Sequence, residues 1–145
     1  NCVALEPDAP YPRYRYGVAL AEAGEHEEAL RQFDELLGMP RAEVHGLVGK
    51  GHLLAITGRT QEARAILTQL IEMSKSRYVS NYYLAEICAG LGDVDEAMMW
   101  LDRAYDEGPV LIISLNSNPK FKVLRTDPRF QALLRRVGLW DAGAN

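Results

Sequence analysis

The densest group of residues that could do chemistry is the stretch Val44-His45-Gly46-Leu47-Val48-Gly49-Lys50-Gly51-His52. Glycines beside a lysine are typical of phosphate-binding loops, in which backbone N–H groups and the lysine hold the phosphates. Such a loop needs four residues between its first Gly and the Gly-Lys pair, and a Ser or Thr after the Lys. Here Gly46 stands two residues too close and Gly51 follows Lys50, so the spacing argues against a phosphate loop.

The other reactive side chains are too scattered to form a catalytic or metal site. His45 and His52 are seven residues apart, which is two turns of a helix, so they cannot share one metal ion without a third element such as Glu86. Cys2 and Cys88 have no metal-binding or redox spacing, which favours a buried structural thiol at Cys88 and a reducing compartment. We therefore predict no catalytic residue, no metal and no cofactor.

The elements that position these residues follow from a phrase that occurs three times at a constant spacing. Its copies are Gly24-Glu25-His26-Glu27-Glu28-Ala29, Gly58-Arg59-Thr60-Gln61-Glu62-Ala63 and Gly92-Asp93-Val94-Asp95-Glu96-Ala97. Each Gly can end a first helix in the left-handed conformation, and each Glu then lies near the positive end of a second helix. Each Ala allows close helix contact, and a large apolar residue follows four positions later: Phe33, Leu67 and Leu101.

The spacing is a 34-residue period, which is that of tetratricopeptide repeats, and the chain resembles this family over residues 11–109. The small position of the first helix is held by Gly17, Gly51 and Ala85, and the apolar position three residues later by Leu20, Leu54 and Cys88. The chain departs from the family pattern where Arg13, Leu47 and Asn81 replace an aromatic, and where Arg41 and Lys75 replace a closing Pro that is kept as Pro109. The resemblance implies an all-α fold, a solenoid of antiparallel helix pairs with C-terminal capping helices.

The same frame gives the expected organisation of the chain. We expect the end of a severed preceding repeat over 1–10, repeat units over 11–41, 42–76 and 77–109, capping helices over 110–139 and a disordered tail over 140–145. Because repeats stack only on their neighbours, the first complete helix should leave an uncovered apolar face, a candidate for self-association into a homodimer. In this frame Gly46 and Gly49 fall inside a helix, which is then either locally loose or closely approached by something.

The repeated phrase does not recur after Pro109. The apolar run Val110 to Leu115 favours a short helix laid across the last repeat, with a strand as the alternative. Further on, Asp127 and Pro128 are expected to cap and start a helix with the apolar stripe Phe130, Leu133, Leu134 and Val137, which Gly138 ends. Asp93 is the corresponding cap in the third unit. The stretch Pro119 to Leu134 resembles the end of tetratricopeptide regions in bacterial regulatory proteins, where such arrays often follow a winged-helix, nucleotide-cyclase or kinase domain.

Charge is unevenly distributed along the chain. Residues 1–118 carry 10 Lys or Arg and 18 Asp or Glu, a balance of −8, whereas residues 119–145 carry 6 and 2, a balance of +4. The basic residues of this tail are Lys120, Lys122, Arg125, Arg129, Arg135 and Arg136. We interpret them as a solvated outer face, with a nucleic-acid or acidic-protein contact as the alternative.

The resemblance to the family also implies a function. First helices line the concave face of such arrays, and peptides bind there. The residues placed on that face by the frame are Tyr14, Arg15, Val18, Glu22, His45, Val48, Gly49, His52, Ile56, Tyr82, Tyr83 and Glu86. We predict a non-enzymatic, cytoplasmic scaffold that binds a peptide or helix of a partner protein, with no membrane partner. The alternative is a self-association or intramolecular regulatory module of a larger bacterial transcriptional regulator, cyclase or kinase.

Overall fold

The structure, a computed structural model, describes residues 10–39, 42–108, 115 and 117–138, and every regular element in these residues is a helix. The elements are α2 (Pro10–Glu22), α3 (His26–Leu37), α4 (Glu43–Ile56), α5 (Thr60–Met73), α6 (Asn81–Leu91), α7 (Val94–Glu107), the 3-10 helix η2 (Pro119–Leu124) and α8 (Pro128–Arg136). They form two units, residues 1–79 and 80–145. The predictions for residues 1–9, for the apolar run 110–114 and for the tail 140–145 lie outside the described residues.

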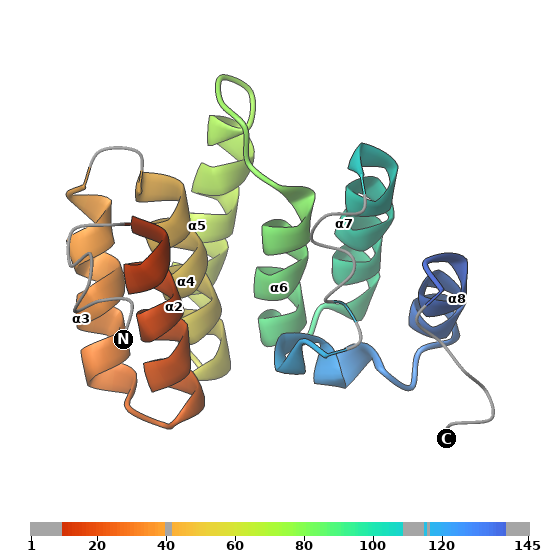
Figure 1. The fold of residues 1–145 in the computed structure, drawn as a ribbon, viewed down its shortest axis with the longest axis horizontal. Coiled ribbons are helices and arrows are strands. Elements are labelled where there is room, and N and C mark those ends of the chain that lie inside the picture. The colour runs from red at the N-terminus through yellow and green to blue at the C-terminus, as the bar shows by residue number, and fades with distance from the viewer. Residues whose placement is uncertain (1–9, 40–41, 109–114, 116, 139–145) are drawn as a thin grey trace. The chain divides into compact units, whose positions relative to one another are not determined.

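Unit 1 contains two helix pairs, α2 with α3 and α4 with α5, as Figure 1 shows. Helix α4 packs against α2, α3 and α5, so it forms the middle of this unit. The second helices bury the residues that the repeated phrase predicts, namely Ala29 and Phe33 in α3, and Ala63 and Leu67 in α5. The predicted all-α fold of helix pairs is therefore confirmed.

The three turn glycines have the left-handed conformation that the sequence predicts. The φ angles of Gly24, Gly58 and Gly92 are 86°, 87° and 79°. In each turn the N–H after the Gly donates to the carbonyl five residues earlier: Glu25 to Leu20 (2.9 Å), Arg59 to Leu54 (2.9 Å) and Asp93 to Cys88 (3.0 Å). These bonds satisfy carbonyl groups that the end of a first helix would otherwise leave without a partner.

The glycines inside the first helices of unit 1 are explained by one aromatic ring. A Cβ atom at Gly17 would lie 2.6 Å from Cε1 of Phe33, and one at Gly49 would lie 2.3 Å from the same atom. At Gly46 a Cβ atom would lie 2.9 Å from the carbonyl oxygen of Phe33. Of the two alternatives for a Gly-rich helix, the structure thus supports close approach: the Phe33 ring fills a notch that α2 and α4 form by lacking side chains.

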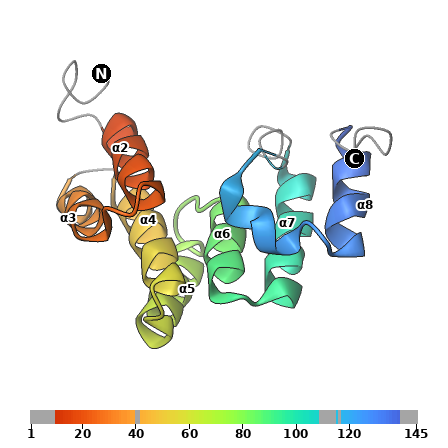
Figure 2. The ribbon, with the colours of Figure 1, turned by 90° about the horizontal axis from the view of Figure 1, so that it is seen from below.

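Unit 2 contains α6 and α7 together with η2 and α8, and η2 lies alongside α6 (Figure 2). Its core holds the aromatic rings of Phe121 and Phe130, whose centroids are 6.2 Å apart. The Asp127 carboxylate accepts a hydrogen bond from the N–H of Arg129 (2.8 Å), and Gly138 follows α8 with a φ of 78°. The predicted cap and stop of this helix are confirmed.

The helices of the tail begin at positions that continue the 34-residue spacing of the repeats. The second helices of the three repeats begin at His26, Thr60 and Val94, and α8 begins at Pro128, one further repeat period after Val94. The N-cap Asp127 likewise follows the N-cap Asp93 by one repeat period. The repeated phrase therefore ends at Pro109, but the helical arrangement continues beyond it. The helices η2 and α8 occupy the places of a shortened fourth helix pair.

Candidate binding face

The predicted groove residues of unit 1 are divided between buried and exposed positions. Those that are buried are Tyr14, Val18, Val48, Gly49 and His52. The exposed ones are Arg15 and Glu22 on α2 and Ile56 on α4, and His45 is half-buried. Ile56 is 47% exposed and stands one repeat period after Glu22, so the two residues occupy the same position at the ends of consecutive first helices.

In unit 2 the chain's own tail covers two of the three predicted groove residues. Tyr82 and Glu86 are buried, and Tyr83 is half-buried. The Asn118 Nδ2 group donates to Tyr82 Oη (2.9 Å) and to Glu86 Oε2 (2.8 Å). The ammonium group of Lys120 lies 3.3 Å from Glu86 Oε1, and both side chains are at most 10% exposed.

The face predicted from the sequence is thus partly an internal contact. Tyr14 of α2 meets the ring of His45 on α4 edge to face at 5.2 Å, and Tyr82 of α6 meets Phe121 of η2 in the same way at 5.3 Å. In both units these aromatic residues lie where one first helix packs against the next. A partner could reach Arg15, Glu22 and Ile56, and in part His45 and Tyr83, without moving the chain.

The surroundings of His45 shift the pKa of its imidazole. Burial lowers the pKa of His45, because the half-buried ring loses water that would solvate its charged form. The ring is therefore neutral at pH 7. His52 lies seven residues further along the same helix, and the described residues hold no group of three or more His, Cys, Asp or Glu that could bind a metal ion.

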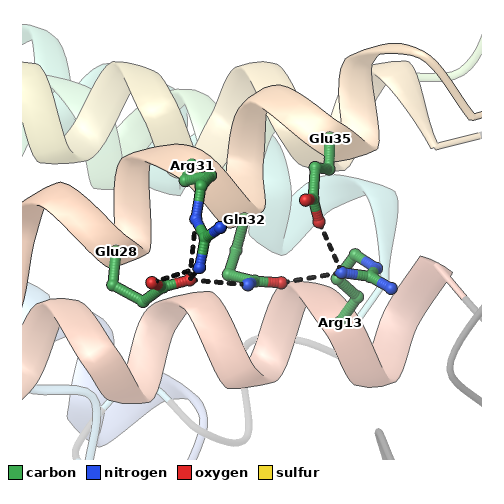
Figure 3. A network of polar contacts seen from close by, with 5 residues as sticks. All are labelled: Arg13, Glu28, Arg31, Gln32 and Glu35. Carbon is green, nitrogen blue, oxygen red and sulfur yellow. Dashed lines mark hydrogen bonds and ion pairs between the residues drawn. The ribbon is translucent and has the colours of Figure 1, made fainter.

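A polar network between α2 and α3 was not predicted (Figure 3). Arg13 Nη1 donates to Gln32 Oε1 (2.8 Å) and to Glu35 Oε2 (2.7 Å). Gln32 in turn donates to Glu28 Oε2 (2.9 Å), which also accepts from Arg31 Nη2 (2.7 Å). The hydrogen bonds from Arg31 hold the pKa of Glu28 below its usual range. Arg13 is thus a polar replacement for the usual aromatic residue, whereas the second unit has buried Leu47 at that position.

A second unpredicted feature is a set of ion pairs between residues that are one repeat period apart. The acid comes first in every pair: Glu43 with Arg77 (3.1 Å), Glu86 with Lys120 (3.3 Å), Asp95 with Arg129 (2.8 Å) and Asp102 with Arg136 (3.9 Å). Acids and bases at this spacing are visible in the sequence, but the interpretation of the basic tail as a solvated outer face does not connect them. Opposite charges one repeat apart are the signal that would have found these contacts.

The interpretation of the basic tail as a wholly solvated face is therefore wrong for Lys120, which is buried against Glu86. Arg129 and Arg136 are about half exposed, and each also reaches an acid of α7. Arg136 lies over the Tyr105 ring as well, with its guanidinium carbon 4.5 Å from the ring centroid. Lys120, Arg129 and Arg136 of the tail thus bind acids of the third repeat.

Within the described ranges, none of the helices combines the length with the apolar character that crossing a membrane requires.

Comparison with known proteins agrees with the periodicity. Two family models, each described as tetratricopeptide repeat, match the chain at residues 10–35 and 48–111. These ranges include α2 and most of α3, and the stretch from α4 to the end of α7. No curated protein and no solved structure has a significant match to the chain.

Proposed function

Since the chain belongs to the tetratricopeptide repeat family, whose repeats generally mediate protein–protein interaction, we propose that it is a non-enzymatic scaffold that binds a peptide or helix of a partner protein. The proposed contact is the exposed part of the first-helix face in unit 1, which contains Arg15, Glu22 and Ile56. The two cysteines of the chain have neither metal-binding nor redox spacing, which supports a reducing compartment such as the cytoplasm as the place where it acts.

The exposure of Ile56 is the observation that carries this proposal. The side chain of Ile56 is 47% exposed, and its burial by a partner would stabilise the complex, because removing apolar surface from water is favourable. Arg15 is exposed on the neighbouring first helix, and arginine is enriched among the residues that dominate binding energy at interfaces. Glu22, at the same repeat position as Ile56, adds a negative charge and so favours a partner that offers an apolar side chain beside a basic one.

The experiment is partner capture with exposed residues changed. Tyr14 and Tyr82 are buried, so replacing them would disturb the fold as well as any groove. We therefore expect the double variant Arg15→Glu/Ile56→Glu to lose the partners that the wild-type chain captures, with an unchanged circular dichroism spectrum. Val123→Glu is the matched control, because Val123 is 49% exposed but lies on η2 in unit 2. If the double variant captures the same proteins as wild type, the proposed face is excluded.

Self-association is a second candidate, favoured by the outer side of α2. Tyr16, Ala19, Leu20 and Ala23 recur at spacings of three and four residues, and Tyr16 is 42% exposed. An apolar stripe of this kind is suited to packing against another helix, including one from a second copy in a homodimer or one elsewhere in a larger regulatory protein. Light scattering at increasing concentration tests the dimer: Tyr16→Glu should give a monomer where wild type dimerises, and a wild-type monomer throughout would exclude self-association.

A further inference from the structure

Helix α6 carries a buried carboxylate that is bound entirely by one short segment of the tail. Oε2 of Glu86 accepts from Asn118 Nδ2 (2.8 Å), and Oε1 faces the ammonium group of Lys120 (3.3 Å). The Asn118 amide also donates to the hydroxyl group of Tyr82 (2.9 Å). A buried charge is costly unless it is paired and hydrogen-bonded, so Glu86 requires an occupant that brings both a cation and a second donor.

The same segment supplies an aromatic ring. Phe121 is buried, and its ring meets Tyr82 edge to face at 5.3 Å with an interplanar angle of 81°. The hydrophobic contact and the three polar contacts come from four consecutive residues, Asn118 to Phe121. A contact of this kind, with a charge, an amide and a ring from one short stretch, resembles the way in which a protein binds a peptide.

The buried carboxylate of Glu86 is particular to the third repeat. In the 34-residue frame, Glu86 corresponds to Val18 in the first repeat and to His52 in the second. Among these three positions only the third holds an acidic side chain. The surrounding charge is also complementary to a basic occupant, because residues 80–118 contain seven Asp or Glu and a single Arg. This field attracts basic segments and opposes acidic ones.

We infer that the α6 face formed by Tyr82 and Glu86 is a receptor for a lysine-bearing segment, and that residues 118–121 of the same chain close it. This inference rests on the proposed function and specifies it: the first-helix face of unit 1 is open, whereas that of unit 2 is filled by an internal ligand. A partner that uses the α6 face must displace this ligand, and it must offer a lysine, an amide donor and an aromatic ring of its own.

The test uses the full chain and a fluorescent peptide with the sequence of residues 117–124. Asn118→Ala/Lys120→Ala removes the internal donors and leaves Tyr82 and Glu86 in place. We expect this opened variant to bind the peptide at least about tenfold more tightly than wild type, since each hydrogen bond to a charged group is worth about a factor of ten or more. Adding Glu86→Gln to the opened variant should remove this gain. Lys122→Ala is the matched control, because Lys122 is exposed and should leave peptide binding as in wild type.

A second measurement keeps the test decisive if the opened variant loses its fold. Amide hydrogen exchange of the wild-type chain is followed with and without an excess of unlabelled peptide, and faster exchange in η2 is expected when the peptide displaces it. Equal peptide affinity of the opened variant and wild type, no effect of Glu86→Gln, or unchanged exchange in η2 would overturn the receptor. Both measurements report on α6, whereas capture through Ile56 reports on unit 1, so either proposal can fail without the other.

Discussion

Units 1 and 2 stabilise the contact between successive repeats in different ways. In unit 1 the contact depends on shape, because the ring of Phe33 fills a notch that Gly17 and Gly49 leave between α2 and α4. In unit 2 a buried ion pair contributes to it, because Glu86 of α6 pairs with Lys120 of η2 one repeat later, whereas the pairs that Asp95 and Asp102 make with α8 are exposed. Shape complementarity tolerates salt and changes of pH but not changes of volume. Charge complementarity has the opposite sensitivities, so the two units should respond to different perturbations.

The largest effect is expected from Phe33→Ala, which empties the notch of unit 1. Phe33 is fully buried, and truncation of a buried Phe costs about 3–5 kcal/mol of the free energy of unfolding. Native-state hydrogen exchange should show this loss in the amides of α2, α3 and α4, while those of α8 keep their protection. Tyr78→Ala is the control, since Tyr78 is an aromatic residue of unit 1 that is 75% exposed. Equal loss of protection in both units would contradict the division between them.

Lys120→Met should have the next largest effect, now confined to unit 2. It removes the cation from a pair whose side chains are 10% and 5% exposed, and it leaves the Glu86 carboxylate with Asn118 alone. Removing one partner of a buried pair costs about 3–5 kcal/mol, and the remaining hydrogen bond places the expected loss near about 3 kcal/mol. The measurement is denaturant unfolding followed by the protection of η2 and α8.

The double variant Glu86→Leu/Lys120→Met serves as the control for that result. Because apolar residues of similar volume can replace a buried ion pair without loss, we expect it to recover most of the stability. The exposed Lys122→Met should change the free energy of unfolding by less than about 0.5 kcal/mol. If Lys120→Met were as mild as Lys122→Met, charge would not be what stabilises this contact.

Gly49→Ala should change the free energy of unfolding less, and the sign of the change should depend on whether the Phe33 ring is present. The added Cβ atom would lie 2.3 Å from the Phe33 ring, and overpacking of this kind costs about 1–3 kcal/mol. Alanine also favours the helix by about 1 kcal/mol relative to Gly, so the net loss should be about 0–2 kcal/mol. In a Phe33→Leu background, where the ring is absent, the same substitution should stabilise the chain. Thermal unfolding of the four variants in this cycle measures the change of sign.

The comparison also shows which features can be predicted from the sequence. The turn glycines and the caps at Asp93 and Asp127 are local, because each depends on a few neighbouring residues, and they were predicted correctly. The burial of Tyr14 and Tyr82 is not local. It depends on which element packs against each first helix. In unit 2 the element that packs against α6 is the 3-10 helix η2, which the repeated phrase does not follow.

The internal glycines illustrate the same limit. The sequence indicates that Gly49 lies within a helix and that something must explain it, but it does not identify Phe33 as the ring that fills the space. The ion pairs lie between these two cases. Their spacing of one repeat period is written in the sequence, and only the position of α8 relative to α7 shows that the paired side chains meet.

The smallest effect is expected from Arg129→Gln at the edge of unit 2. Arg129 Nη2 lies 2.8 Å from Asp95 Oδ1, whose side chain is largely exposed, and 2.9 Å from Asp127 Oδ2. Exposed pairs of this kind contribute little and are screened by salt, so the difference between Arg129→Gln and wild type should be small at low salt and vanish at about 1 M salt.

The pH dependence of this variant distinguishes loss of charge from loss of packing. Hydrogen bonds from Arg129 hold the pKa of Asp127 below its usual value. A carboxyl group whose pKa is lowered by folding stabilises the native state above its unfolded pKa, and this contribution is lost as pH falls through the folded pKa. In Arg129→Gln the pKa of Asp127 should rise toward its ordinary value, so acid unfolding of unit 2 should begin at a higher pH than in wild type. Unit 1 provides the internal control, since its Phe33 contact does not titrate: a shift of acid unfolding in both units would show that the substitution acts through something other than this charge.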